Sequence, residues 1–131
     1  MRFSINEINN TLGICNSNNS INQNLFFKRV CIDSRDLKPD DLFVAIKGNR
    51  FDGHDFIDEV ISKGAKAVVL SKAVKNLPRD FPFWKVPNTI MAFQKLALLK
   101  RRKLGITVIA ITGSVGKTTT KEMAGLVLNK F

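Results

Sequence analysis

The sequence has few of the residues that form disulfides or bind zinc. It contains two cysteines and one histidine among 131 residues. The spacing of Cys15 and Cys31 matches no zinc or redox motif. We therefore expect both thiols to be reduced, with Cys31 buried in the apolar run at 30–32.

Long hydrophobic runs are also missing. The longest apolar stretch, at 106–111, is far shorter than the roughly 20 residues that a membrane-spanning helix needs. The first six residues lack the apolar core and the small-residue cleavage site of a signal peptide. Both absences favour a cytoplasmic protein without a membrane partner.

Acidic residues are scarce: 11 stand against 21 lysines and arginines, which gives a formal net charge of +10. Such an excess raises the hypothesis of nucleic-acid binding. The charges are mostly dispersed, however, and the dense run at 100–103 lies where a predicted helix ends and complements its dipole. No aromatic residues alternate with this run to stack on bases. We expect a solvated helix end and no nucleic-acid partner, and we attribute part of the excess to anionic ligands.

The sequence does contain an alternation of strand and helix patterns, which is typical of an α/β protein. Hydrophobic residues make up 44% and charged residues 24%, as in an ordinary globular domain. Polar and glycine-rich segments predict turns and loops at 16–24, 39–41, 47–53 and 73–82. Apolar segments predict strands at 28–33, 42–46, 65–70 and 83–86, the last at the domain edge, and helices at 54–63 and 88–104.

Helical spacing defines an apolar face on each predicted helix. On the first helix, which Gly64 is expected to end in the left-handed conformation, this face consists of Phe56, Ile57, Val60 and Ile61. Asn88 and Gly105 have the chemistry to cap the two ends of the second helix. Its predicted apolar stripe consists of Ile90, Phe93, Leu96, Ala97 and Leu104.

The run at 106–111 is rich in β-branched residues and predicts a central parallel strand, buried on both faces. A helix follows at 118–130, with Met123, Leu126 and Val127 expected to face inward. A buried parallel strand needs neighbours, and no further strand is predicted after it. We therefore predict two domains, 1–86 and 87–131, the second of them truncated after one strand and one helix.

Between this strand and helix lies a glycine loop with the features of a phosphate-binding loop. Backbone N–H groups of such a loop and the open N-terminus of the next helix converge on an anion. Lys117 would place a positive charge at the β- and γ-phosphates, and the Thr118 hydroxyl would bind Mg²⁺, so these two are the predicted catalytic residues. The predicted ATP-binding residues are Gly113, Ser114, Val115, Gly116, Lys117, Thr118 and Thr119.

The spacing of this loop departs from the general pattern G-x-x-x-x-G-K-[ST], because Ile111 stands five residues before Gly116. The loop instead has the shorter form G-x-x-G-K-T. The alternative interpretation is a glycine-serine turn followed by a surface lysine. The strand pattern before the loop and the helix pattern after it favour phosphate binding.

The segment at 112–123, Thr-Gly-Ser-Val-Gly-Lys-Thr-Thr-Thr-Lys-Glu-Met, resembles the ATP loop of the Mur ligases, which build the peptide of bacterial cell-wall precursors. Four earlier motifs, at 33–35, 41–48, 52–56 and 64–68, resemble the UDP-binding domain that the MurE and MurF types share. The loop is most similar to the MurF type, with the MurE type as the close alternative. Asp40 stands where the family usually has glycine, and Phe93 where it usually has leucine; aspartate tolerates a left-handed turn.

The resemblance implies which residues contact the substrate. Ser34, Asn49, Arg50 and Phe51 match positions at which MurE-type relatives contact the uridine nucleotide. The Arg50 guanidinium can pair with a diphosphate, although an ordinary surface arginine fits this position equally well.

Three neighbouring residues have structural roles in the same interpretation. Asp33 and Arg35 are expected to pair with each other and fix their loop. His54, at a helix start, is expected to cap the helix or anchor the loop rather than to act as a catalytic base.

The resemblance also implies an ATP- and Mg²⁺-dependent ligase of peptidoglycan synthesis. It would join UDP-N-acetylmuramoyl-tripeptide to D-alanyl-D-alanine through an acyl phosphate. The chain matches only the first domain of the family enzyme and the opening of the second, so we expect it to be inactive alone and to need the missing C-terminal part. A non-catalytic nucleotide-binding module and a MurE-type ligase that adds the third peptide residue remain the alternatives.

Overall fold

A computed structural model describes residues 2–13, 15, 16 and 24–130 of the chain. Within these residues a parallel sheet contains four strands in the order β3 (Val30–Cys31), β4 (Leu42–Val44), β5 (Ala67–Leu70) and β6 (Phe83–Lys85). The α/β fold class and the edge position of the strand at 83–85 confirm the predictions. Each strand is shorter than predicted.

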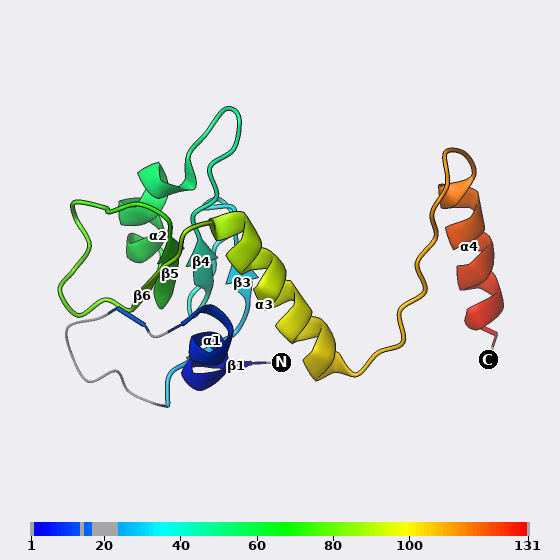
Figure 1. Ribbon diagram of the computed structural model, residues 1–131, viewed down its shortest axis with the longest axis horizontal. Helices are drawn as coiled ribbons and strands as arrows, with labels where there is room; N and C mark the ends of the chain where they lie inside the picture. The colour runs from blue at the N-terminus through cyan, green and yellow to red at the C-terminus, as the bar shows by residue number, and fades with distance from the viewer. Residues whose placement is uncertain (1, 14, 17–23, 131) are drawn as a thin grey trace.

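Two helical layers cover opposite faces of this sheet. Helix α2 (Ile57–Ser62), which follows the short 3₁₀ helix η1 (Gly53–Phe56), covers one face, and α1 (Ile5–Leu12) and α3 (Thr89–Leu104) cover the other (Figure 1). Side chains of β4 alternate between the layers: Leu42 and Val44 pack with α1 and α3, whereas Phe43 packs with α2. The sheet therefore has an apolar core on each face.

The first 27 residues contain more structure than the sequence interpretation assigned to them. Strand β1 (Phe3–Ser4) pairs antiparallel with β2 (Phe26–Phe27). Helix α1 begins with a capping box, in which the Glu7 backbone N–H donates to Ser4 Oγ and the Ser4 backbone N–H donates to the Glu7 carboxylate. The Ser-x-x-Glu pattern is the sequence signal that locates this helix. The predicted loop at 16–24 lies mostly outside the described residues.

The predicted bounds of α3 are confirmed. The Asn88 side chain accepts a hydrogen bond of 3.0 Å from the backbone N–H of Met91, and Gly105 ends the helix with a φ of +59°. The basic run at 100–103 is exposed, as predicted. Lys103 also reaches back to α1, where its Nζ lies 2.7 Å from Glu7 Oε1.

The predicted apolar stripe of α3 is largely wrong. Leu96 is buried as predicted and Phe93 is half-buried, but Ile90, Ala97 and Leu104 are exposed. The face that meets the sheet is rotated by about one residue, because the small side chain of Ala92 allows close packing there. The buried residues of α3 are Thr89, Ala92 and Leu96.

The segment at 106–130 differs most from its prediction. Residues 106–112 form neither helix nor strand, and Ile109 is 64% exposed. The predicted buried strand is wrong because no described strand lies beside this segment to share backbone hydrogen bonds. Helix α4 (Lys117–Leu128) does form, but it stands apart from the rest of the molecule (Figure 1). The side chains expected to face inward, Met123, Leu126 and Val127, are exposed.

Both cysteines are free and buried, and the burial of Cys31 confirms the prediction. Burial raises the pKa of the Cys15 thiol to about 11, so this thiol stays protonated at neutral pH. Among the described helices, none is long and apolar enough to cross a membrane.

Candidate functional site

A pocket of about 430 Å³ lies at the carboxyl ends of β3 and β4. Loops that follow parallel strands meet at this edge of a sheet, where α/β proteins bind their ligands. The walls come from the loop after β3, from the segment after β4, and from η1 and α2. The lining residues are Ile32, Asp33, Ser34, Arg35, Phe43, Ile46, Phe51, Gly53, Phe56 and Glu59.

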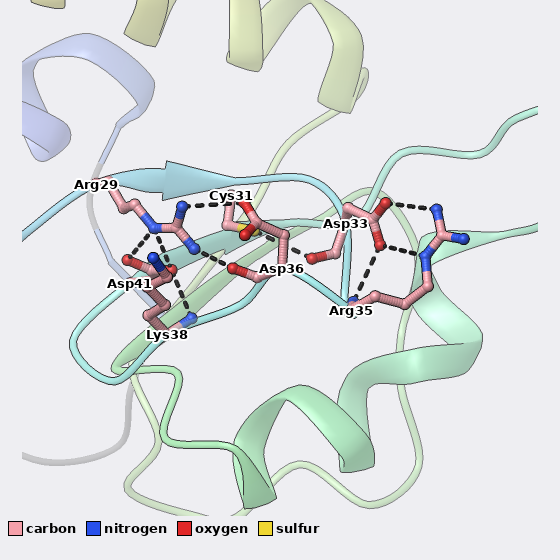
Figure 2. A network of polar contacts seen from close by, with 7 residues as sticks. All are labelled: Arg29, Cys31, Asp33, Arg35, Asp36, Lys38 and Asp41. Atoms are coloured by element: carbon pink, nitrogen blue, oxygen red, sulfur yellow. Dashed lines mark hydrogen bonds and ion pairs between the residues drawn. The ribbon is translucent and has the colours of Figure 1, made fainter.

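The loop at 33–41, which forms one wall, is closed by an ion-pair network. Arg29 Nε lies 3.0 Å and 2.8 Å from the two carboxylate oxygens of Asp41, whose side chain is only 1% exposed. The same guanidinium donates to the Asp36 carboxylate at 3.0 Å and to the Asp36 carbonyl. Asp41 also accepts the backbone N–H of Lys38 at 2.8 Å. Figure 2 shows Arg29 between Asp36 and Asp41, so one side chain from before β3 fixes the shape of this wall.

Asp33 and Arg35 form the structural pair that the sequence predicts. Two hydrogen bonds of 2.9 Å and 2.6 Å join the guanidinium to the carboxylate, and the backbone N–H of Arg35 adds a third of 3.0 Å (Figure 2). These side-chain and backbone hydrogen bonds lower the pKa of the Asp33 carboxyl to about 2. The pair therefore presents a fixed, ionised surface at the pocket.

Ser34 lies between these two paired residues and is tied to the part of the pocket that α2 forms. Its backbone carbonyl accepts a hydrogen bond of 2.9 Å from Lys63 Nζ. The same ammonium lies 2.5 Å from Glu59 Oε1, on helix α2. Lys63 thus links the loop after β3 to the helix that lines the pocket, and it holds the Ser34 backbone in place.

The wall that faces this loop belongs to a short hairpin at 47–52. Lys47 and Asp52 form an antiparallel bridge, and the backbone N–H of Gly48 donates to the Phe51 carbonyl at 2.8 Å. The Phe51 ring is 71% exposed, although it lines the pocket. An exposed aromatic ring beside a cavity provides a surface for a planar ligand group.

Gly53 sets the path of the chain directly after this hairpin. Its N–H donates to the Ile46 carbonyl at 2.9 Å. A Cβ atom at Gly53 would lie 2.8 Å from the Ile46 nitrogen, closer than real contacts allow. The hairpin can therefore close onto the sheet only with glycine at this position.

His54 anchors the hairpin, as the sequence predicts, and it is buried. Its Nδ1 lies 2.6 Å from Asp52 Oδ1, and its Nε2 accepts the backbone N–H of Ser71 at 2.9 Å. Lys72 Nζ lies 2.8 Å from the other Asp52 oxygen. Burial raises the pKa of the Asp52 carboxyl, but hydrogen bonds from Lys72 and His54 outweigh burial, and the pKa is lowered. The Asp52 carboxylate is consequently ionised.

The structure brings together two of the four predicted substrate residues. Ser34 and Phe51 lie on opposite walls of one pocket. Asn49 and Arg50 lie exposed at the tip of the hairpin and are not among the pocket-lining residues. Their contacts with a substrate stay a prediction.

The glycine loop before α4 contains two glycines with positive φ. Gly113 and Gly116 have φ values of +149° and +78°. Gly116 is the N-cap of α4 and offers no side-chain cap, so the first N–H groups of the helix are open to a ligand. The Lys117 ammonium folds back onto the Gly113 carbonyl. No residue of the segment at 106–130 lines the pocket described above.

Several residues that shape the pocket are absent from the sequence-based prediction. The Arg29 network joins residues that lie seven and twelve positions apart, and no local pattern indicates it. The pair of Glu59 and Lys63 is visible as an i,i+4 spacing, but its link to Ser34 spans 29 positions.

Sequence comparison relates the chain to characterised proteins. A family profile described as "Mur ligase family, catalytic domain" matches residues 27–115. The UDP-N-acetylmuramoyl-tripeptide–D-alanyl-D-alanine ligase of Rickettsia prowazekii is 48% identical over 110 residues, which cover 84% of this chain and 23% of that protein. The ligase of the same name from Synechocystis is 39% identical over 112 residues, or 86% of this chain and 25% of that protein. The chain thus spans about a quarter of the length of these relatives.

Solved structures give the same relationship. A crystal structure of MurF from Acinetobacter baumannii matches with a TM-score of 0.83 and 29% identity, covering 100% of this chain and 28% of that chain. The MurF ligase from Thermotoga maritima, solved in complex with ADP, matches with a TM-score of 0.59 and 44% identity over 72% of this chain and 21% of that chain.

Proposed function

The chain belongs to the Mur ligase family, and from this premise we propose that it supplies the UDP-substrate pocket and the phosphate loop of a MurF-type ligase. The complete activity would be the ATP-dependent addition of D-alanyl-D-alanine to UDP-N-acetylmuramoyl-tripeptide in peptidoglycan synthesis. Both relatives named above are D-alanyl-D-alanine ligases, which favours this activity over that of the MurE type.

The observation that carries the proposal is the pocket between Ser34 and Phe51. The Ser34 hydroxyl offers a donor and an acceptor to the uridine moiety, and the Phe51 ring offers an apolar face. Asn49 and Arg50 lie on the same hairpin, at its exposed tip. From there the Arg50 guanidinium would pair with the diphosphate, which it can bind with two parallel hydrogen bonds.

The second nucleotide site would be the loop at 113–119. Its positive φ glycines, its lysine and the uncapped start of α4 fit a nucleotide phosphate. Bound ATP would supply the phosphoryl group that activates the substrate carboxylate. Lys117 would stabilise charge on the γ-phosphoryl group, and the Thr118 hydroxyl would hold Mg²⁺. The relative solved in complex with ADP supports an adenine nucleotide as a ligand of the complete ligase.

We propose the division of the chain at residue 86, with 1–86 as the substrate domain and 87–131 as the start of the ATP-binding domain. Ala92 and Leu96 of α3 nevertheless pack on the core of the first unit. The relatives are about four times as long as the matched region, and the groups that bind D-alanyl-D-alanine would lie in their remainder. We therefore expect no phosphate release from this chain with all three substrates; clear turnover would contradict this part of the proposal.

The substrate pocket is tested by isothermal titration of the full chain with UDP. Saturable binding is expected, and Ser34→Ala should weaken it by about 1 kcal/mol, which is roughly fivefold in Kd, because one hydrogen bond is lost. Ser62→Ala removes an exposed hydroxyl on α2 that does not line the pocket, and it should bind UDP like the unaltered chain. If UDP does not bind, or if both variants bind it equally well, the proposed pocket is wrong.

A further inference from the structure

We propose that His54 is a positioning residue for the nucleotide pocket, because it fastens the hairpin at 47–52 to the end of β5. Through this link it holds Phe51 against the pocket. The inference rests on the proposed function, since it assigns a role in binding the same uridine nucleotide. His54 itself is not among the residues that line the pocket.

The hydrogen bonds of His54 define its state. The Ser71 backbone N–H can only donate, so His54 Nε2 must be an acceptor in the 2.9 Å hydrogen bond between them. The proton of the neutral ring is therefore on Nδ1, which donates to Asp52 Oδ1 at 2.6 Å. Asp52 Oδ1 also accepts the backbone N–H of His54 at 3.0 Å. One buried ring thus joins the last residue of the hairpin to the residue directly after β5.

The hairpin depends on this connection because it projects from the sheet. Figure 1 shows the segment between β4 and η1 extending away from the packed layers. Asn49, Arg50 and Phe51 are exposed, so little apolar burial holds the tip. Ring packing between Phe51 and Phe56 is edge-on, with 6.4 Å between the centroids. The buried His54 ring is the rigid base from which this exposed arm extends.

An outer contact supports the same carboxylate. Lys72 Nζ lies 2.8 Å from Asp52 Oδ2, and the Lys72 side chain is 54% exposed. A single exposed ion pair adds little to stability, so Lys72 can be replaced without unfolding the protein. Replacement of Lys72 should therefore weaken the anchor slightly, whereas replacement of His54 should weaken it strongly.

The test combines UDP titration with amide hydrogen exchange on the full chain. His54→Asn keeps a donor for Asp52 and loses the acceptor for Ser71. His54→Gln keeps an acceptor for Ser71 and loses the donor for Asp52. Each variant should weaken UDP binding about tenfold. Lys72→Gln should weaken it about twofold. Lys85→Gln, which removes a lysine from the end of the neighbouring strand β6, should leave the affinity unchanged.

Hydrogen exchange separates positioning from general stability. The amide of Gly48 donates a hydrogen bond within the hairpin, and the amide of Gly53 donates one directly beside it. The amide of Ala45 instead donates to the Val69 carbonyl inside the sheet. In the His54 variants the two glycine amides should exchange faster while the Ala45 amide is unaffected. Equal acceleration of all three amides, or unchanged UDP affinity in His54→Asn, would overturn the proposal. Absence of UDP binding by the unaltered chain would instead overturn the proposed function, and this inference with it.

Discussion

The region up to residue 105 and the segment at 106–130 both contain strand and helix patterns, but only the first of them forms a packed core. The described residues between 2 and 105 form a parallel sheet with helices packed on both faces, whereas α4 has no buried residue. A helix completes its hydrogen bonds within itself, so α4 forms alone. A strand needs a neighbour, so the segment at 106–112 stays without secondary structure. The first region therefore holds a formed pocket, whereas no strand among the described residues lies beside the segment that leads into the loop of the second.

The largest expected effect is on the free energy of unfolding, which should depend on the first region and hardly at all on α4. Trp84 is 1% exposed, and its Nε1 donates to Asn9 Oδ1 at 2.9 Å and to the Gly13 carbonyl at 3.1 Å. Trp84→Ala should lower the free energy of unfolding by about 3–5 kcal/mol. Leu126→Ala on α4 should change it by less than about 0.5 kcal/mol. Urea denaturation followed by circular dichroism measures both; a large loss in the α4 variant would show that α4 is packed after all.

Substitutions at two glycines, one in each region, test the same difference in packing. A Cβ atom at Gly53 would meet the backbone of Ile46 at 2.8 Å, whereas a Cβ atom at Gly125 would have no neighbour within 4 Å apart from adjacent residues and the backbone of its own helix. Gly53→Ala should destabilise the packed region by about 1–3 kcal/mol through overpacking. Gly125→Ala should instead stabilise α4 by about 1 kcal/mol. Thermal unfolding measures the first effect, and the helical signal in circular dichroism measures the second. If both substitutions stabilise or both destabilise the chain, the two regions do not differ in packing as described.

The two regions should also differ in which nucleotide they bind. Lys117→Ala removes the charge expected at the ATP phosphates, so it should weaken ATP·Mg²⁺ binding about tenfold and leave UDP binding unchanged. Lys121→Ala, one turn further along α4, is the matched control and should affect neither ligand. Isothermal titration measures all four affinities. Undiminished ATP affinity in the Lys117 variant would remove the phosphate loop from the proposed function.

The smallest expected effect is on the stability of the packed region at low pH. Asp40, with a φ of +73°, pairs with Lys28 at 2.6 Å and Lys66 at 2.7 Å. These hydrogen bonds, that of Lys28 first, lower the pKa of the Asp40 carboxyl from its usual 3.8 to about 2. Because the folded-state pKa is depressed, the pair stabilises the packed region above pH 3.8 and loses this effect as the pH falls toward 2.

Asp40→Asn tests this contribution, since asparagine also tolerates the left-handed turn. The variant should show a flatter loss of stability than the unaltered chain between pH 4 and pH 2, where Asp40 takes up its proton. Urea midpoints measured across this range give the difference. Parallel curves for the two proteins would mean that the Asp40 pairs contribute nothing.

Local signals explain what the sequence predicts well. Asn88 and Gly105 define α3 because caps depend on nearby backbone groups. The left-handed turn at Asp40 and the hairpin anchor at His54 are also local features. The apolar run at 42–46 predicts a strand, and β4 forms there with side chains buried on both faces of the sheet.

Long-range contacts explain what the sequence does not predict. The stripe of α3 is rotated because the fit of Ala92 against the sheet, rather than helical spacing alone, selects the buried face. The link from Lys63 to Ser34 and the Arg29 network join segments that only the fold brings together. The strand predicted at 106–111 fails for the same reason, since a strand is defined by its neighbours.

Amide chemical shifts, recorded by NMR during separate titrations with UDP and with ATP·Mg²⁺, test the central claim most directly. We predict that UDP shifts the amides of Ser34, Phe51 and Gly53 and leaves those at 113–119 unchanged, and that ATP·Mg²⁺ does the reverse. Shifts from both nucleotides in the same region, or no response to UDP around the pocket, would contradict two separate nucleotide sites on the two regions of this chain.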